Sequence, residues 1–203
     1  LGSPYVISET GTFNPDSDWI HDPKNKTEEG YEICRDIIAD ICDFAAAHDA
    51  EFLIETYVNN VIGSVEETLR LFADINSPQL GLLMDPTNYF ESHNIDNMDD
   101  ELNKIFDALS DKIKIAHAKD VKRADDDAIE KHANIDAAES HTLRGVGAID
   151  LPAPGLGTLN YDLYLQRLHK HHPNIPIIIE HLDETDVPRA KKFLDEKLEA
   201  IGC

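Results

Sequence analysis

Strand-like and helix-like segments alternate along the chain, and this alternation predicts an α/β fold built on a parallel sheet. With 203 residues and a hydrophobic content of 41%, the chain is long enough and apolar enough for one well-packed domain. Its apolar strand segments recur with a spacing close to the roughly 30 residues of one βα unit in a (β/α)8 barrel. We therefore predict a TIM-barrel-type fold in a single, partial domain over residues 1–203.

Five segments are expected as strands, and each is followed by a segment expected as a helix. The expected strands are residues 5–9, 52–55, 80–85, 113–117 and 176–180. The expected helices run from Thr27 to about Phe44, from Ser64 to about Phe72, over about 99–109, over 161–171 and over about 187–200. Five strands cannot close an eight-stranded barrel, so we expect about five C-terminal βα units, with about three N-terminal units missing.

Local signals support the helices. Thr27 precedes two glutamates in the first turn, where negative charge is favourable, and Ser64 with Glu67 forms a capping box. Pro188 suits the first turn of the last helix. Apolar residues at helical spacing mark the faces expected to be buried, among them Tyr31, Cys34, Ile37, Ile38, Ile41 and Phe44 in the first helix and Val65, Leu69 and Phe72 in the second.

Residues 121–157 interrupt the alternation. They are rich in aspartate, glycine and proline and hold only short apolar groups. A loop of this length is uncommon in a compact domain and is usually functional or disordered. We expect a mobile segment near the C-terminal ends of the strands that covers the pocket or is disordered, with a short helix near residues 125–138.

The charge of the chain excludes several classes of partner. Lys+Arg 18 against Asp+Glu 40 gives a net charge of −22, which disfavours nucleic acid and anionic membranes. No apolar run approaches the roughly 18 residues needed to span a bilayer, and the N-terminal residues lack the features of a signal peptide. The three cysteines show neither metal-site spacing nor a disulfide framework, which indicates a reducing, cytoplasmic environment.

Four expected strands carry a side chain typical of metal ligands at or near their C-terminal ends: Glu55, Asp85, His117 and Glu180. A buried carboxylate is costly unless it is paired or bound to metal. Each residue also has a structural explanation, such as an ion pair for Glu55, an Asx turn for Asp85 or a buried core position for His117. Glu180 follows three isoleucines and is the hardest to explain in this way.

Taken together, the four residues predict a site for one divalent metal ion at the face where barrel enzymes keep their active sites. Mixed carboxylate and imidazole ligation leaves Mn, Mg, Co, Fe and Zn open. A metal held by carboxylates suits chemistry in which a carbonyl is polarised while a carboxylate moves the neighbouring proton.

Further residues are weaker candidates for contact with a substrate. Glu9 ends the first strand, Trp19 lies in the loop after it, Asn88 lies three residues after Asp85, and Lys119 lies two after His117. Their structural alternatives are a strand-end carboxylate for Glu9, packing for Trp19, a capped turn for Asn88 and an ion pair with Asp120 for Lys119. The glycines of PGLGTLNY could approach a phosphate or only shape a turn.

The segments SETGTFNP, IETYVNNV, MDPTNYF, HAKDV, PGLGTLNYDLYLQRL and IIIEHL, in this order, resemble the sugar phosphate isomerase/epimerase family within the xylose isomerase-like TIM-barrel superfamily. The resemblance implies that Glu55, Asp85, His117 and Glu180 hold the metal and that Glu55 and Glu180 act as the acid/base pair. Two positions differ from the ketose epimerases of this superfamily: Val61 stands where they have a glutamate and Asn88 where they have a histidine.

The expected function is therefore that of a metal-dependent isomerase or epimerase of a small sugar, sugar phosphate or related polyol. A dehydratase of a keto-inositol type substrate and a non-catalytic sugar-binding barrel are the alternatives, and a DNA-repair nuclease is disfavoured by the charge. We expect a carbohydrate substrate, no nucleic-acid or membrane partner, and association into a homo-oligomer as one option.

Overall fold

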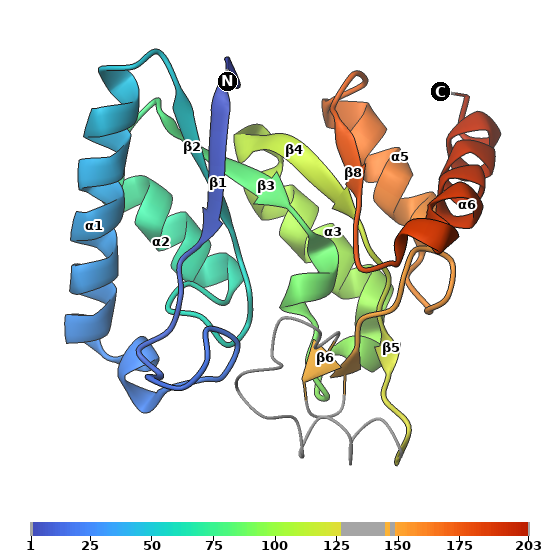
Figure 1. The fold of residues 1–203 in the computed structure, drawn as a ribbon, viewed down its shortest axis with the longest axis horizontal. Coiled ribbons are helices and arrows are strands. Elements are labelled where there is room, and N and C mark those ends of the chain that lie inside the picture. The colour runs from blue at the N-terminus through green and yellow to red at the C-terminus, as the bar shows by residue number, and fades with distance from the viewer. Residues whose placement is uncertain (1, 127–144, 147–148, 203) are drawn as a thin grey trace. The chain divides into compact units, whose positions relative to one another are not determined.

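The computed structural model describes residues 2–126, 145–146 and 149–202 (Figure 1). The chain divides into two compact units. The first holds the residues up to Met84 together with Lys112–Lys114, and the second holds Asp85–Asp111 and the residues from Ile115 onward. Within the described residues, no helix combines the length and the apolar character needed to cross a membrane. The single domain over residues 1–203 stays a prediction.

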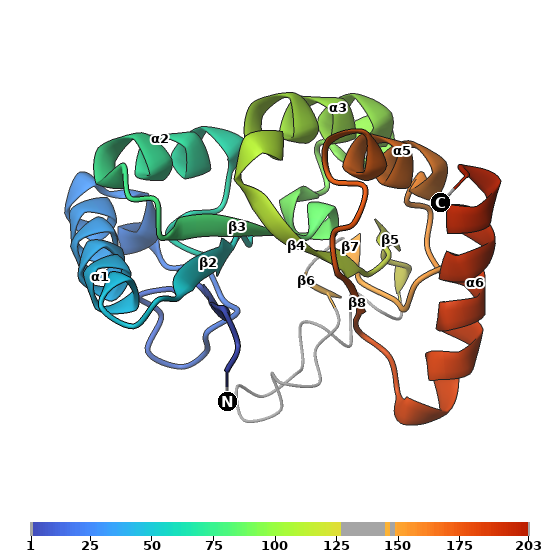
Figure 2. The same ribbon diagram turned by 90° about the horizontal axis from the view of Figure 1, so that it is seen from above.

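The first unit is built from parallel strands and two helices: β1 (Tyr5–Glu9), α1 (Glu28–Ala46), β2 (Glu51–Glu55), α2 (Val65–Ile75) and β3 (Leu80–Met84). β1 pairs with β2 so that Glu9 lies opposite Glu55, and β2 pairs with β3 so that Glu55 lies opposite Leu83. Figure 2 shows α1 and α2 on the same side of these strands. The C-terminal ends of β1, β2 and β3 therefore share one edge of the sheet.

The helix starts of this unit follow from the sequence signals. The Thr27 hydroxyl accepts a hydrogen bond from the Gly30 amide at 3.0 Å, and the Ser64 hydroxyl accepts one from the Glu67 amide at 3.2 Å. In a capping box the glutamate returns a bond to the cap residue. Here the Glu67 carboxylate instead accepts from the amide of Gly63 at 2.8 Å, one residue earlier.

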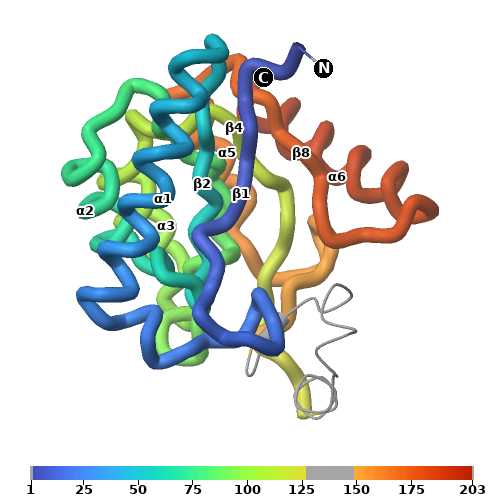
Figure 3. Tube along the Cα trace, turned by 60° about the vertical axis from the view of Figure 1, so that its left-hand side comes forward, coloured from blue at the N-terminus to red at the C-terminus, as the bar shows by residue number. Residues whose placement is uncertain are grey.

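The second unit contains the remaining βα elements: α3 (Met98–Leu109), β4 (Ile113–Ala118, whose first two residues belong to the first unit), α5 (Tyr161–His171), β8 (Ile177–Ile179) and α6 (Val187–Ala200). Short 3-10 helices at Pro86–Tyr89 and Ile95–Asn97 precede α3. β4 and β8 are parallel, with His117 opposite Ile178. Helix α6 packs against α5 and β8, as the trace in Figure 3 shows for β8.

The strand order of the main sheet is β1-β2-β3-β4-β8, which is also the order of these strands in the chain. Neighbouring parallel strands that follow one another in sequence and are joined by helices are what successive βα units of a barrel produce. The five expected strands and the five expected helices are confirmed, with bounds close to those expected from the sequence.

The central strands are buried and the edge strands are not. Nearly all residues of β2, β3 and β4 are buried, as expected for parallel strands covered on both faces. In contrast, the edge strand β1 exposes Val6 at 59% and Ile7 at 37%, and the edge strand β8 exposes Ile178 at 43%. The described strands thus leave apolar surface at both edges of the sheet.

The helices lie where the spacing of apolar residues predicted them, but some residues expected on their buried faces are exposed. Tyr31, Cys34 and Ile38 of α1 are buried as expected, whereas Ile37 and Phe44 are exposed. Leu69 of α2 is likewise exposed at 42%. These helices carry more apolar residues than the described part of the chain covers.

Residues 121–157 contain more regular structure than expected. β5 (Lys122–Arg123), β6 (Gly145–Val146) and β7 (Ile149–Asp150) form a small antiparallel sheet in the order β5-β7-β6. The Asp120 amide donates to the Pro152 carbonyl at 3.0 Å, which joins the end of this segment to the C-terminal end of β4. The expected helix near 125–138 lies almost entirely outside the described residues, and the role as a cover stays a prediction.

Candidate metal centre

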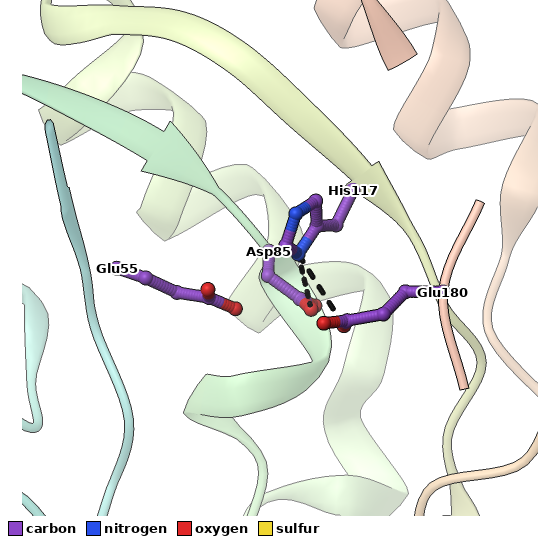
Figure 4. Close-up of side chains that lie close together, drawn as sticks. All are labelled: Glu55, Asp85, His117 and Glu180. Carbon is purple, nitrogen blue, oxygen red and sulfur yellow. Dashed lines mark ion pairs between the residues drawn. The ribbon is translucent and has the colours of Figure 1, made fainter. Parts of the chain in front are cut away.

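Three of the predicted ligands meet in the second unit. Asp85 directly follows β3, His117 is the next-to-last residue of β4, and Glu180 directly follows β8. Each offers one ligand atom, and these atoms lie within 4.8 Å of one another. Figure 4 shows the two carboxylates and the imidazole pointing toward one another. Because the strands are parallel, the sheet brings together residues that are 32 and 63 positions apart in the chain.

The two oxygens of Asp85 have different partners. Oδ1 accepts hydrogen bonds from the amide of Thr87 at 2.9 Å and from its hydroxyl at 2.6 Å, which begins the 3-10 helix at Pro86. Oδ2 faces the cluster, at 3.6 Å from His117 Nδ1 and 2.7 Å from Lys119 Nζ. The Asx turn and the metal ligand are therefore compatible in one side chain, and Thr87 fixes its orientation.

Glu180 reaches the cluster from the C-terminal end of β8, the strand that pairs with β4. Its amide donates to the Ala118 carbonyl at 3.0 Å, which extends the β4–β8 pairing by one residue. Its Oε2 lies 3.3 Å from His117 Nδ1 and 3.2 Å from Lys119 Nζ. The side chain is 35% exposed, compared with 0% for Asp85, so Glu180 can be reached from outside.

Two tyrosines of α5 donate hydrogen bonds to backbone carbonyls at the C-terminal end of β4. The Tyr164 hydroxyl donates to the His117 carbonyl at 2.8 Å, and the Tyr161 hydroxyl donates to the Lys119 carbonyl at 3.0 Å. Both rings are buried. These bonds hold the backbone from which the imidazole and the ammonium project.

Both carboxylates are ionised at neutral pH. Burial raises the pKa of Asp85, but the Lys119 ammonium and the contact with His117 outweigh burial and hold the pKa well below its usual value. Burial also raises the pKa of Glu180, and there the contact with His117 and the charge of Lys119 prevail and lower it to about 2. Deprotonated carboxylates are the form that binds metal.

The Lys119 ammonium lies among oxygens of the cluster. It contacts Asp85 and Glu180, and it donates to Asn88 Oδ1 at 2.9 Å. Asn88 is 4% exposed. The sequence candidates Asn88 and Lys119 are thus brought together beside the metal ligands.

Asp120 instead organises the glycine-containing loop. Its carboxylate accepts from the amides of Val121, Gly155 and Leu159 at 2.8 to 2.9 Å. A Cβ at Gly157 would lie 2.3 Å from Asp120 Oδ1, so the loop closes tightly around this side chain. The amides of this loop therefore bind an internal carboxylate, which supports the turn-shaping role of the glycines over the phosphate contact.

The first unit places Glu55 and Glu9 side by side at the ends of β2 and β1, as the strand register gives it. Glu55, also drawn in Figure 4, is 6% exposed. Trp19 packs edge-on against Tyr57, with ring centroids 5.9 Å apart, and its carbonyl accepts from the Asn59 side chain. Packing thus accounts for the position of Trp19, and a contact of Glu9 or Trp19 with substrate stays a prediction.

The residues present fit a divalent cation. Asp85 Oδ2 and Glu180 Oε2 are buried and make no hydrogen bond of good geometry within the described residues, so their charges face the centre of the cluster. Two carboxylates and an imidazole suit several divalent metals, from Mg to Zn, so the donor set leaves the identity of the ion open.

Parallel strands in chain order, with metal-type ligands at their C-terminal ends, define a protein of the (β/α)-barrel class with a candidate metal site. A family model described as xylose isomerase-like TIM barrel matches residues 1–198, and the chain belongs to this family. The predicted fold class and the predicted family are both confirmed.

Solved structures with the same fold differ in what they are reported to be. A D-tagatose 3-epimerase-like protein has a TM-score of 0.66 and 20% identity, covering 98% of this chain and 63% of its own. A probable 3-DHS dehydratase involved in petrobactin synthesis from Bacillus anthracis has a TM-score of 0.64 and 18% identity, covering 98% and 64%. A xylose isomerase-like TIM barrel protein from Mycobacterium smegmatis in complex with magnesium has a TM-score of 0.62 and 15% identity, covering 98% and 61%.

These identities establish the fold alone, and the chain spans less than two thirds of the length of each of these proteins. A search of curated protein sequences finds no match.

The residues that orient the ligands were not predicted from the sequence. Thr87, Tyr161 and Tyr164 act through hydrogen bonds to residues far away in sequence or to one oxygen of a ligand. His181 has a positive φ of 59° and its Nδ1 lies 3.0 Å from the Leu151 carbonyl, which fixes the turn after Glu180. Only Thr87 had a local signal, since an Asx turn brings the residue two positions after an aspartate close to its carboxylate.

Proposed function

We propose that this chain belongs to a divalent-metal-dependent isomerase or epimerase that moves a proton next to a carbonyl of a small sugar, sugar phosphate or related polyol. Membership of the xylose isomerase-like family supports a sugar-modifying enzyme. The observation that carries the proposal is the cluster of Asp85, His117 and Glu180, whose ligand atoms lie within 4.8 Å of one another.

Glu55 is proposed as the fourth ligand. In the strand register it lies opposite Leu83, and Asp85 follows two residues later in the chain. Because C-terminal ends of neighbouring parallel strands share one edge, this register favours a common site for Glu55 and Asp85.

The proposed mechanism assigns each residue a task. A bound divalent ion would polarise a substrate carbonyl or bind adjacent hydroxyls, which makes the neighbouring proton easier to remove. Glu180 takes that proton, because it is ionised at neutral pH and partly exposed. Glu55, as the second member of the pair, would return to the substrate a proton taken up from solvent, and Glu180 would release the proton it took to solvent. Lys119 with Asn88 would hold a substrate oxygen.

The amides of residues 155–159 bind Asp120, so they do not serve as a phosphate cradle in this proposal. This favours a sugar or polyol without phosphate over a sugar phosphate. Glu9 and Trp19 are proposed to contact the substrate from the first unit, and cytoplasmic location without nucleic-acid or membrane partners remains part of the proposal.

A dehydratase of a keto-inositol type substrate is the alternative, since proton removal beside a carbonyl begins that reaction as well. A non-catalytic sugar-binding protein would need the same fold but no proton transfer. Both alternatives are separated from the proposal by the fate of the substrate.

The test incubates the full chain with Mn²⁺ in deuterium oxide and a panel of ketoses, aldoses and keto-inositols. We expect deuterium to enter the carbon next to the carbonyl of one substrate, together with its epimer or isomer. Loss of water from the substrate would establish the dehydratase instead. Binding of a sugar without any exchange by the metal-loaded protein would contradict an enzymatic role.

A further inference from the structure

The Lys119 ammonium is buried among oxygens of the candidate metal centre. Lys119 is 4% exposed, and lysine is almost never fully buried unless it is paired. Its Nζ lies 2.7 Å from Asp85 Oδ2, 3.2 Å from Glu180 Oε2 and 2.9 Å from Asn88 Oδ1. Two of these three oxygens belong to residues that would hold the metal.

The same two oxygens also face the imidazole. His117 Nδ1 lies 3.6 Å from Asp85 Oδ2 and 3.3 Å from Glu180 Oε2. A metal ion bound by these three atoms would therefore have to share both carboxylate oxygens with the ammonium. A divalent ion and an ammonium that compete for the same oxygens at about 2–3 Å repel one another strongly in a buried site.

We propose that Lys119 is an internal counter-ion that holds the place of the metal and is displaced by it. In the metal-free protein the ammonium offsets part of the negative charge of Asp85 and Glu180, whose oxygens Oδ2 and Oε2 are both buried. When a divalent ion binds, the ammonium gives up these oxygens. The inference rests on the proposed metal site but not on the proposed reaction.

Asn88 gives the ammonium one partner that it can keep when the metal binds. Its amide oxygen is neutral and buried, and it follows Asp85 on the 3-10 helix at Pro86–Tyr89. Lys119 can keep this hydrogen bond while its other donors turn to a substrate oxygen. Metal binding would thereby prepare the lysine for the substrate, so the two should bind in that order.

The test compares Lys119→Met with the wild type in two measurements on the full chain: Mn²⁺ affinity by calorimetry, and thermal unfolding with and without chelator. We expect the variant to bind Mn²⁺ at least about tenfold more tightly. We also expect it to melt at a lower temperature in chelator, with the deficit reduced when Mn²⁺ is present. A purely structural lysine would not produce effects of opposite sign.

The matched control is Lys122→Met, since Lys122 lies on β5 in the same unit but pairs with Asp150, outside the cluster. It should leave Mn²⁺ affinity unchanged. Equal or weaker Mn²⁺ binding by Lys119→Met would overturn the inference, as would unchanged stability in chelator. Should this variant fold only with Mn²⁺, the inference is supported, and failure to fold with Mn²⁺ contradicts it.

The two proposals fail separately. Absence of Mn²⁺ binding by the wild type and by Lys119→Met alike would contradict both the metal site and the proposed role of Lys119 as a counter-ion displaced by the metal. Normal Mn²⁺ binding with the expected effects of the variant, but no turnover of any sugar, would sink only the proposed reaction.

Discussion

Asp85 illustrates how one side chain meets a structural and a chemical need. One oxygen caps a 3-10 helix through Thr87, and the other faces His117 and Lys119. The hydrogen bonds to Thr87 remove the rotational freedom of the carboxylate. A ligand whose orientation is fixed before the ion arrives loses little entropy on binding.

Glu180→Gln should separate metal binding from proton transfer. The amide oxygen can still coordinate weakly, but it cannot accept a proton at neutral pH, so we expect solvent exchange into a validated substrate to fall by about 10²–10⁴-fold. The control is Glu184→Gln, an exposed glutamate in the turn before α6. Exchange at the wild-type rate with metal bound would make Glu180 a ligand only and leave the base to Glu55 or another group.

The lowered pKa of Glu180 also predicts an acid-sensitive stability. Its pKa falls from a reference value of 4.5 to about 2 in the folded protein. A depressed pKa means stability that is present above the unfolded value and is lost as the pH falls toward the folded one. In chelator, the free energy of unfolding should therefore decrease between about pH 4.5 and about pH 2.

Urea unfolding of the wild type and Glu180→Gln across this range checks the prediction. The difference in the free energy of unfolding between the two proteins should shrink as the pH falls. Burial raises the pKa of Asp120, but both proteins contain this residue, so its contribution to the pH dependence cancels in the difference. A difference that is constant from pH 6 to pH 2 would show that Glu180 gains nothing from its charge in the folded state.

At the level of elements, hydrogen bonds tie the C-terminal end of β4 to the loop before α5. Asp120 binds amides of residues 155–159, and the tyrosines of α5 bind carbonyls of His117 and Lys119. These hydrogen bonds therefore hold the backbone of the strand end that carries His117 and Lys119.

Asp120→Asn should destabilise this connection. The amide group that replaces one carboxylate oxygen would face a backbone N–H, and a buried donor without an acceptor costs about 1–3 kcal/mol. Asp162→Asn is the control, because Asp162 makes an exposed ion pair with Lys197, and such a pair contributes little. Chemical denaturation measures both. Equal stability of Asp120→Asn and the wild type would show that the loop does not depend on this carboxylate.

The elements and the ligand positions could be predicted because both depend on local signals. Apolar strands that end in a carboxylate or histidine are visible in sequence, and parallel strands place such residues at one edge. The partner of Lys119 could not be predicted this way. Asp120 is adjacent in sequence, but successive side chains along extended backbone point to opposite sides, so Lys119 and Asp120 reach different surroundings. Likewise, helical spacing placed Phe44 on the face expected to be buried, but spacing alone does not tell whether another element covers that position.

On the scale of the whole molecule, apolar surface remains at both edges of the sheet. Val6 and Ile7 of β1 and Ile178 of β8 are exposed, and edge strands with free apolar faces tend to pair with other chains. The solved structures of the same fold are longer than this chain. We therefore predict that the chain can associate with itself through these edges.

Sedimentation velocity should detect concentration-dependent association of the 203-residue chain. The double variant Val6→Lys/Ile178→Lys should remain monomeric at higher concentration, since a lysine on an edge strand opposes pairing. Leu69→Lys is the control, because Leu69 is similarly exposed but lies on α2. Association that is unchanged by the edge lysines would place the contact elsewhere.

If the ends of three strands together hold one divalent ion, calorimetric titration with Mn²⁺ will detect it. We predict binding of one ion per chain, loss of that binding in His117→Gln, and retention in His172→Gln, whose ring contacts the Ser110 carbonyl outside the cluster. Absence of binding by the wild type, or equal binding by His117→Gln, would contradict a metal site at these strand ends.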